Sequence, residues 1–291
     1  MRFQETFATS TRQRRSTSAA RSTPPSISRP PRVFAAHWLA PGATRELTLE
    51  RRKELVRLVA ASGVLPNMEV ALQAAGFVGT VATALDSAAE AGQLSMCQWL
   101  WDYSRSCTED VCEACSAYDA WMSAAYGGHQ HVCEWLLTVD PGAEDLEHWA
   151  IASAFYAGHV DLAEWLLQQQ RRTPSTTIDS DFQYLRGVAH GCDLPTLQRA
   201  WLRFGPPKKR NQKTTLLSSA AGSSTPDWAA KVEWLEVQGC PWSTEVAKSA
   251  ASLANEGEVL ARLTWLRGRG YPVDGDAVLP AASKGNMQVL E

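Results

Sequence analysis

The stretch that decides the fold runs from Ala154 to Leu167 and reads Ala-Phe-Tyr-Ala-Gly-His-Val-Asp-Leu-Ala-Glu-Trp-Leu-Leu. Its small and apolar residues predict the end of one short helix, which stops at Gly158 because glycine readily adopts the left-handed conformation that ends a helix. A second, amphipathic helix follows and carries Trp165 and Leu166. The stretch therefore predicts two helices joined by a tight turn.

The same order of residues occurs twice more, earlier in the chain. Ala124 to Leu137 reads Ala-Ala-Tyr-Gly-Gly-His-Gln-His-Val-Cys-Glu-Trp-Leu-Leu, and Ala88 to Trp101 reads Ala-Ala-Glu-Ala-Gly-Gln-Leu-Ser-Met-Cys-Gln-Trp-Leu-Trp. In all three copies the Trp stands seven residues after the Gly. Such recurrence predicts an array of stacked helical units, and arrays of this kind usually bind partners.

Weaker copies continue the pattern toward the end of the chain. They cover Gly187 to Trp201, Thr215 to Leu235 and Ser249 to Leu266, and the successive tryptophans of all copies are 36, 30, 36, 33 and 31 residues apart. The recurring Gly is expected to end the first helix of each unit, and the recurring Trp to fill the space between units. These structural anchors are Gly92, Trp99, Gly128, Trp135, Gly158, Trp165, Trp201, Trp234 and Trp265.

The frame Thr-x-Leu-x-x-Ala-Ala-x-x-Gly, followed by a hydrophobic outer helix, resembles the ankyrin repeat, whose period is about 33 residues. The connectors Gln238 to Trp242 (Gln-Gly-Cys-Pro-Trp) and Arg269 to Asp274 (Arg-Gly-Tyr-Pro-Val-Asp) resemble those of a divergent ankyrin group common in algae and other protists. The resemblance covers Thr44 to the end and implies an all-α solenoid of stacked helix-turn-helix units. Every copy lacks the Pro and His of the family's Thr-Pro-Leu-His opening, and the place of that His is taken by Asp86, Met122, Ala152 and Ser218.

Elementary packing supports the same architecture. Pairs such as Ala124-Ala125 let neighbouring helices approach closely, and a Trp on the outer helix can bury about 200 Å² between units. At about 25 cal/mol per Å² this burial is worth several kcal/mol. The substitution Trp165→Ala is therefore expected to cost about 3–5 kcal/mol.

The sequence divides the chain into three segments. Residues 1–32 hold seven arginines and one acid among many Ser, Thr and Pro, and this composition predicts a disordered tail. Its two interpretations are an unstructured tail and an organelle transit peptide, since transit peptides are rich in Arg and Ser and poor in acids. Residues 33–43 are expected to pack as an N-terminal cap, and residues 44–291 to form the ankyrin-like repeat array, beginning with a helix over 44–61.

The last repeat of the array is predicted to be truncated. Ala281-Ala282, Gly285 and Val289 are in register with the earlier copies, and Glu291 matches the Glu that directly precedes each Trp. The expected Trp would follow Glu291, so the sequence predicts a truncated gene product or a fragment.

Composition restricts the classes of function. The chain has 291 residues, 45% of them apolar, and it contains no apolar run long enough for a membrane span. Its net charge is −3, and without residues 1–32 it is more acidic still, which disfavours a nucleic-acid partner. Seven cysteines without a dense framework favour a reducing, intracellular compartment, cytoplasm or nucleus. The chain is expected to be monomeric.

Two groups of residues are candidates for a metal site or a targeting signal. The cysteines at 107, 112 and 115 lie near His129, His131 and Cys133, but their spacing does not match a zinc motif, and no metal or other cofactor is expected. His129 and His159 follow helix-ending glycines and are expected to be structural. The basic run Pro206 to Lys213 is expected to be a solvated linker, with a nuclear-import signal as the alternative.

Register within the repeat predicts the partner-binding positions. In ankyrin arrays the two residues after the Ala-Ala pair, and the residue before the opening Thr position, face the concave side. Tyr126 and Tyr156 lie one repeat apart and form the expected anchor, because Tyr is enriched at binding hot spots. The full set is Glu90, Tyr118, Tyr126, His148, Tyr156 and Thr214.

The sequence therefore predicts a non-catalytic protein–protein interaction module that binds a protein partner on the concave face of the solenoid. The alternative is the substrate-recognition part of a larger assembly, such as a ubiquitin-ligase adaptor whose effector domain is missing. An enzyme is disfavoured because no nucleophile elbow, phosphate loop or dinucleotide fingerprint occurs.

Overall fold

The computed structural model describes residues 32–76, 81–106, 117–140, 147–170 and 180–284. Within these ranges every regular element is an α-helix, so the predicted all-α class is confirmed. Most of the N-terminal tail, the three cysteines at 107, 112 and 115, and the end of the chain with Gly285 and Val289 lie outside the described residues.

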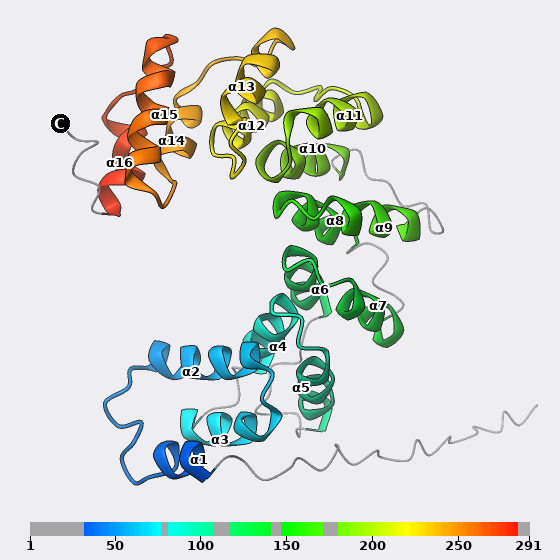
Figure 1. Ribbon diagram of the computed structural model, residues 1–291, viewed down its shortest axis with the longest axis vertical. Coiled ribbons are helices and arrows are strands. Elements are labelled where there is room, and N and C mark those ends of the chain that lie inside the picture. Colours follow the sequence, from blue (N-terminus) through cyan, green and yellow to red (C-terminus); the bar gives the residue numbers. More distant parts are fainter. Residues whose placement is uncertain (1–31, 77–80, 107–116, 141–146, 171–179, 285–291) are drawn as a thin grey trace, which may run out of the picture.

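Alternate helices of the chain pack against one another in series and line the inner side of an arc (Figure 1). We call the surface that they form the inner face. These inner helices are α2 (Leu49–Ser62), α4 (Val81–Glu90), α6 (Ala117–Tyr126), α8 (Glu147–Tyr156), α10 (Ser180–Gly191), α12 (Arg210–Ala221), α14 (Thr244–Ala251) and α16 (Gly275–Ser283).

A second row of helices lies outside the first, and each outer helix packs on the inner helix that precedes it in the chain. The short helix α1 (Arg32–Trp38) packs on α3, at the start of this row, and its Phe34 lies against the hydrophobic core. The outer helices are α3 (Leu65–Ala75), α5 (Leu94–Ser106), α7 (Gln130–Val139), α9 (Val160–Gln170), α11 (Leu194–Phe204), α13 (Trp228–Val237) and α15 (Glu256–Gly268).

Glycines end the inner helices of the three clearest copies, as predicted. Gly92, Gly128 and Gly158 have φ values of 70°, 79° and 86°, the left-handed conformation that side-chain-bearing residues avoid. The residue after each glycine donates its backbone N–H to a carbonyl five residues earlier, for example His159 to Ala154 at 2.8 Å. This bond satisfies a carbonyl at the end of the helix and turns the chain back into the outer helix.

Small side chains fill the layer between adjacent inner helices. Ala88, Ala124, Ala154, Ala220 and Ala250 are all completely buried. Because alanine has no side chain beyond Cβ, the helix backbones come close enough to form one continuous core along the stack.

The outer helices bury the residue after the Trp more deeply than the Trp itself. Leu136 and Leu166 are completely or almost completely buried, whereas Trp135 and Trp165 are only partly buried against the core. Each residue of a helix is rotated by about 100° from the previous one, and this rotation turns the Leu inward and the Trp toward the edge. Trp99 is the exception, with 3% exposure.

The copy that contains Trp201 differs from its expected register. Leu202 is 86% exposed, and the inward positions of α11 are occupied by Leu197 and Ala200 instead. The glycine of this copy, Gly191, is the last residue of α10 and does not have a positive φ. A Cβ at Gly191 would stand 2.2 Å from the carbonyl oxygen of Tyr156, so this glycine is required by the close approach of α8 and α10.

The first helix of the array also begins later than predicted. Thr44 to Leu47 form a turn, and α2 starts at Leu49 because the side chain of Thr48 caps it by accepting the backbone N–H of Arg51 at 3.3 Å. Gly63 ends this helix with φ 70°, as expected.

Candidate functional site

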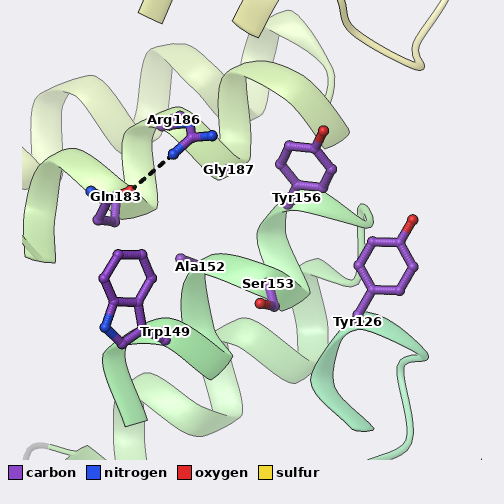
Figure 2. Close-up of a pocket in the computed structure, with 8 residues that line it drawn as sticks. All are labelled: Tyr126, Trp149, Ala152, Ser153, Tyr156, Gln183, Arg186 and Gly187. Atoms are coloured by element: carbon purple, nitrogen blue, oxygen red, sulfur yellow. Dashed lines mark hydrogen bonds between the residues drawn. The ribbon is translucent and has the colours of Figure 1, made fainter. Parts of the chain in front are cut away.

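A shallow hollow of about 130 Å³ opens on the inner face where α6, α8 and α10 meet (Figure 2). Tyr126 and Tyr156 lie side by side at one end of this hollow, and Trp149 lies at the other end. Arg186 lies between the two ends, on α10. We call this site the aromatic hollow. Its lining consists of Tyr126, Trp149, Ala152, Ser153, Tyr156, Gln183, Arg186 and Gly187.

Small residues make the floor of the aromatic hollow. Ala152 and Ser153 lie on α8 between Trp149 and Tyr156, one helical turn from each, and therefore on the same side of the helix. Gly187 faces them from α10, where an added Cβ would stand 2.6 Å from the carbonyl oxygen of Ala152. The close contact of the two helices leaves large side chains only at the rim.

A row of three rings crosses the ends of α6, α8 and α10, and two of these rings line the aromatic hollow. Tyr126 and Tyr156 have ring centroids 6.5 Å apart, and the His190 ring lies 3.7 Å from that of Tyr156 with the planes 5° apart. Nδ1 of His190 is also 3.3 Å from the carbonyl oxygen of Tyr156. Burial lowers the pKa of His190, and nearby cations at Lys231 and Arg186 lower it further, so the imidazole is neutral at pH 7.

The rings are accessible to a partner. Tyr126 is 47% exposed, and Trp149 and Tyr156 are each 36% exposed. Burial raises the pKa of the Tyr156 phenol, which keeps its proton at neutral pH. Its hydroxyl can therefore donate one hydrogen bond and accept others.

Arg186 supplies the single formal charge of the aromatic hollow. Its guanidinium donates a long bond of 3.5 Å to Oε1 of Gln183, one turn earlier on α10. Within the described ranges no carboxylate forms a salt bridge with it. The side chain is exposed, so this cation can meet a partner's anion.

A second hollow, of about 400 Å³, lies further along the inner face between α2 and α4. Two ion pairs within α2 occupy its wall, Lys53 with Glu50 and Arg57 with Glu54. Asp86 and Glu90 line its α4 side. Burial and the neighbouring Asp119 raise the pKa of Asp86 to about 7, and Arg57 opposes this shift.

The structure brings two of the six residues predicted to bind a partner into one site. Tyr126 and Tyr156 line the aromatic hollow, and Glu90 lines the α2–α4 hollow. The other three, Tyr118, His148 and Thr214, line neither of these hollows. His148 stands one residue before Trp149, which lines the aromatic hollow, so the two positions differ by about 100° of helix rotation.

Trp149, Gln183 and Arg186 are the lining residues that the sequence did not indicate. Trp149 occupies the opening position of its repeat, so the sequence assigns it to the repeat frame. Gln183 and Arg186 lie before Gly187, where the sequence predicts the start of the weak copy, but α10 starts at Ser180. Aligning the buried pair Tyr184-Leu185 with Ala150-Ile151 would have placed both residues on the inner face.

A buried lysine joins two repeats in the C-terminal half. Nζ of Lys231 on α13 donates to the carbonyl oxygens of Ala189 at 2.8 Å and Cys192 at 2.7 Å, and to Oγ of Ser223 at 2.6 Å. Burial lowers its pKa to about 8, while the three acceptors favour the ammonium form. Lys231 and Ser223 are completely buried. They therefore stabilise the end of α10 and are not accessible as a base and nucleophile.

Arg262 repeats this arrangement one unit later. It is 1% exposed and donates to the carbonyl oxygens of Ala221 at 2.6 Å and Ser223 at 2.8 Å, at the end of α12. Its guanidinium also lies 4.7 Å from the centre of the Trp228 ring. Both cations stand three residues before the repeat Trp, and both compensate helix carbonyls of the preceding unit.

The histidines and cysteines near 130 have structural contacts. Nε2 of His131 lies 3.0 Å from the carbonyl oxygen of Gly92, and Cys133 is completely buried. The ring of His159 lies against Gly128. Among the residues that the structure describes, no group of three His, Cys, Asp or Glu side chains is arranged to hold a metal ion.

The basic run Pro206 to Lys213 is only partly the predicted linker, because α12 begins at Arg210 and includes the last four residues of the run. Lys208, Lys209 and Arg210 are exposed. No described helix is both long and apolar enough to cross a membrane.

A scan against models of protein families finds no match, and a search of curated proteins finds no relative.

Proposed function

We propose that the helical stack is an ankyrin-like solenoid and that it acts as a non-catalytic interaction module, binding a protein partner on its inner face. One observation carries this proposal. Tyr126, Trp149, Tyr156 and Arg186 come from three helices and gather around one open hollow. Tyr, Trp and Arg are the residue types most enriched at binding hot spots.

These side chains favour binding because of their properties when a partner excludes water from them. Each ring offers a large rigid area at a low cost in conformational entropy, and its polar group remains available for a hydrogen bond. In the free protein the rings are exposed, and the small residues of the floor leave room between them. Covering the hollow would therefore bury apolar surface without moving the backbone.

The repeat anchors support the ankyrin-like assignment. Left-handed glycines at the ends of α4, α6 and α8, paired alanines between inner helices and a Trp-Leu pair on the outer helix recur in the same order. A unit with these features buries one face only, so its stability comes from its neighbours. Such a stack presents a long exposed surface suited to a protein partner.

A capture experiment tests the proposal. The full chain is immobilised and exposed to a lysate, beside the double variant Tyr126→Ala/Tyr156→Ala and the control Trp242→Ala. Trp242 is 55% exposed and lies outside the aromatic hollow, so its removal takes away an exposed ring without touching the site. A partner of the inner face should bind the wild type and Trp242→Ala and should be lost from the double variant, whose helical circular dichroism should be unchanged.

Two results would contradict the proposal. If every captured protein binds the double variant as well as the wild type, the aromatic hollow is not the interaction site. If every captured protein is lost equally with Trp242→Ala, binding follows exposed aromatic surface in general. Co-purification of ubiquitin-ligase components with a partner that depends on the tyrosines would favour the adaptor alternative.

A further inference from the structure

The charges on the inner face are unequally distributed along the stack. Asp86 and Glu90 on α4 and Asp119 on α6 place carboxylates on one side of the aromatic hollow. Asp86 and Asp119 are close enough for their charges to interact. On the other side, α10 presents the guanidinium of Arg186. Lys53 and Arg57 on α2 line the same hollow as Asp86 and Glu90, so the contrast across the rings of α6 and α8 is between the exposed carboxylate of Asp119 and the guanidinium of Arg186.

Of the two charged sides of the aromatic hollow, the positive side at Arg186 is the better defined. It is exposed, lies at the rim of the aromatic hollow and forms no salt bridge with any carboxylate of the described ranges. Arg203 on α11 offers a contrast, since its guanidinium pairs with Glu164 at 2.7 Å. A cation that is unpaired beside exposed rings is complementary to a carboxylate whose neighbouring side chain is apolar.

We propose that the aromatic hollow takes an extended peptide segment whose carboxylate pairs with Arg186, whose apolar side chain lies between Trp149 and the two tyrosines, and whose basic residue lies toward Asp119. This inference rests on the proposed function, and it adds the chemistry and the direction of the bound segment. The guanidinium and the carboxylate can form two parallel hydrogen bonds, which fix the direction in which the segment lies.

The spacing of the helices sets the spacing of charges in the ligand. Neighbouring packed helices lie about 10 Å apart, so the two steps from α6 to α10 span about 20 Å. An extended chain covers about 3.3 Å per residue. The acidic and basic residues of the segment should therefore be separated by about six positions.

The test is a selection from random peptides about nine residues long, a length that covers this span. The 291-residue chain is used as wild type, as Arg186→Glu and as the control Arg199→Glu. Arg199 is exposed on the outer helix α11, so it matches the change in charge at a site away from the inner face. Each selected peptide is then measured against all three proteins and against Tyr126→Ala/Tyr156→Ala.

The wild type and Arg199→Glu should select peptides with Asp or Glu about six positions from Lys or Arg. Arg186→Glu should bind these peptides about tenfold more weakly, and changing the peptide's acidic residue to Lys should restore its affinity, because reversing both charges restores the attraction. The tyrosine double variant should lose binding to the same peptides.

The outcomes separate this inference from the proposed function. If peptides bind through Tyr126 and Tyr156 but show no acidic preference, or if Arg186→Glu binds them equally well, the ligand chemistry is wrong and the interaction site stands. If the selected peptides bind regardless of the tyrosines, or none is selected, the proposed function fails and the inference fails with it.

Discussion

The ring of His190 lies flat on the ring of Tyr156, with centroids 3.7 Å apart and planes 5° apart. The same two residues are joined a second time, since Nδ1 of His190 is 3.3 Å from the carbonyl oxygen of Tyr156. This double contact fixes the end of α8 against the end of α10. It also holds the Tyr156 ring in the orientation in which it lines the aromatic hollow.

Protonation of His190 should destabilise the fold. Its pKa is lowered by burial and then by Lys231, Arg186 and Arg262, while the Tyr156 carbonyl opposes the shift. The unfolded chain therefore binds the proton at a higher pH than the folded chain, and stability rises with pH from the folded pKa up to the unfolded value near 6.5. Because Asp86 changes stability in the opposite direction over the same range, the effect of His190 is measured as a difference between two proteins. The variant His190→Phe keeps a ring on Tyr156, and its free energy of unfolding relative to wild type should be higher at about pH 5 than at about pH 7.5. An equal difference at the two pH values would contradict the assignment.

Removing the buried ammonium should strongly destabilise the C-terminal half. Lys231→Met leaves the carbonyls of Ala189 and Cys192 and the hydroxyl of Ser223 without their donor, which is expected to cost about 2–4 kcal/mol. Lys248→Met, on the surface of α14, should leave the free energy of unfolding unchanged. Chemical denaturation measures both, and equal stabilities would show that the buried hydrogen bonds contribute no net stability.

Two glycine substitutions should act in opposite directions. Gly191→Ala places a Cβ 2.2 Å from the Tyr156 carbonyl oxygen, so α8 and α10 must move apart, at a cost of about 2–4 kcal/mol. Gly268→Ala in α15 meets nothing within 4 Å and should stabilise by up to about 1 kcal/mol, because alanine favours helix. Thermal unfolding followed by circular dichroism distinguishes them. A Gly191→Ala variant as stable as wild type would contradict the close packing described for this contact.

The outer helix should depend more on Leu166 than on Trp165. Leu166 is 1% exposed, so Leu166→Ala is expected to cost about 2–5 kcal/mol. Trp165 is only partly buried, and Trp165→Ala should cost about 1–3 kcal/mol, less than its sequence pattern predicts. The order of the two free energies of unfolding tests the observed register.

Asp86 should weaken the fold at neutral and higher pH. Its pKa of about 7 in the folded chain, against 3.8 as the ordinary value, means that the folded state holds the proton to a higher pH. Stability due to this group therefore falls as the pH rises from about 4 to about 7. Asp86→Asn should gain about 1–2 kcal/mol over wild type at about pH 8 and nothing near pH 3. Asp119→Asn should give a smaller gain in the same direction, because its carboxylate is only the second cause of the shift. Urea titrations at the two pH values would contradict this if the gain were equal at both.

The sequence by itself determined the features that depend on neighbours in the chain. Gly92, Gly128 and Gly158 end helices because their own backbone conformation requires glycine, and the paired alanines mark the packed side of each inner helix. The all-α class followed from this periodicity, and the expectation that Tyr126 and Tyr156 lie at the inner face followed from the resemblance to ankyrin repeats. The predicted binding position His148 is one residue away from the observed one, because Trp149 lines the aromatic hollow and His148 does not.

The tertiary structure alone decided the contacts between units. The acceptors of Lys231 include carbonyls 42 and 39 residues away in the chain, and those of Arg262 lie 41 and 39 residues away. A charged residue at an apolar position of a repeat gives no indication of which carbonyls it will meet. Arg186 joins the tyrosines for the same reason, because its place beside them depends on how α8 and α10 pack at Gly187 and Gly191. Local pattern specifies each helix, whereas the site forms only where three helices come into contact.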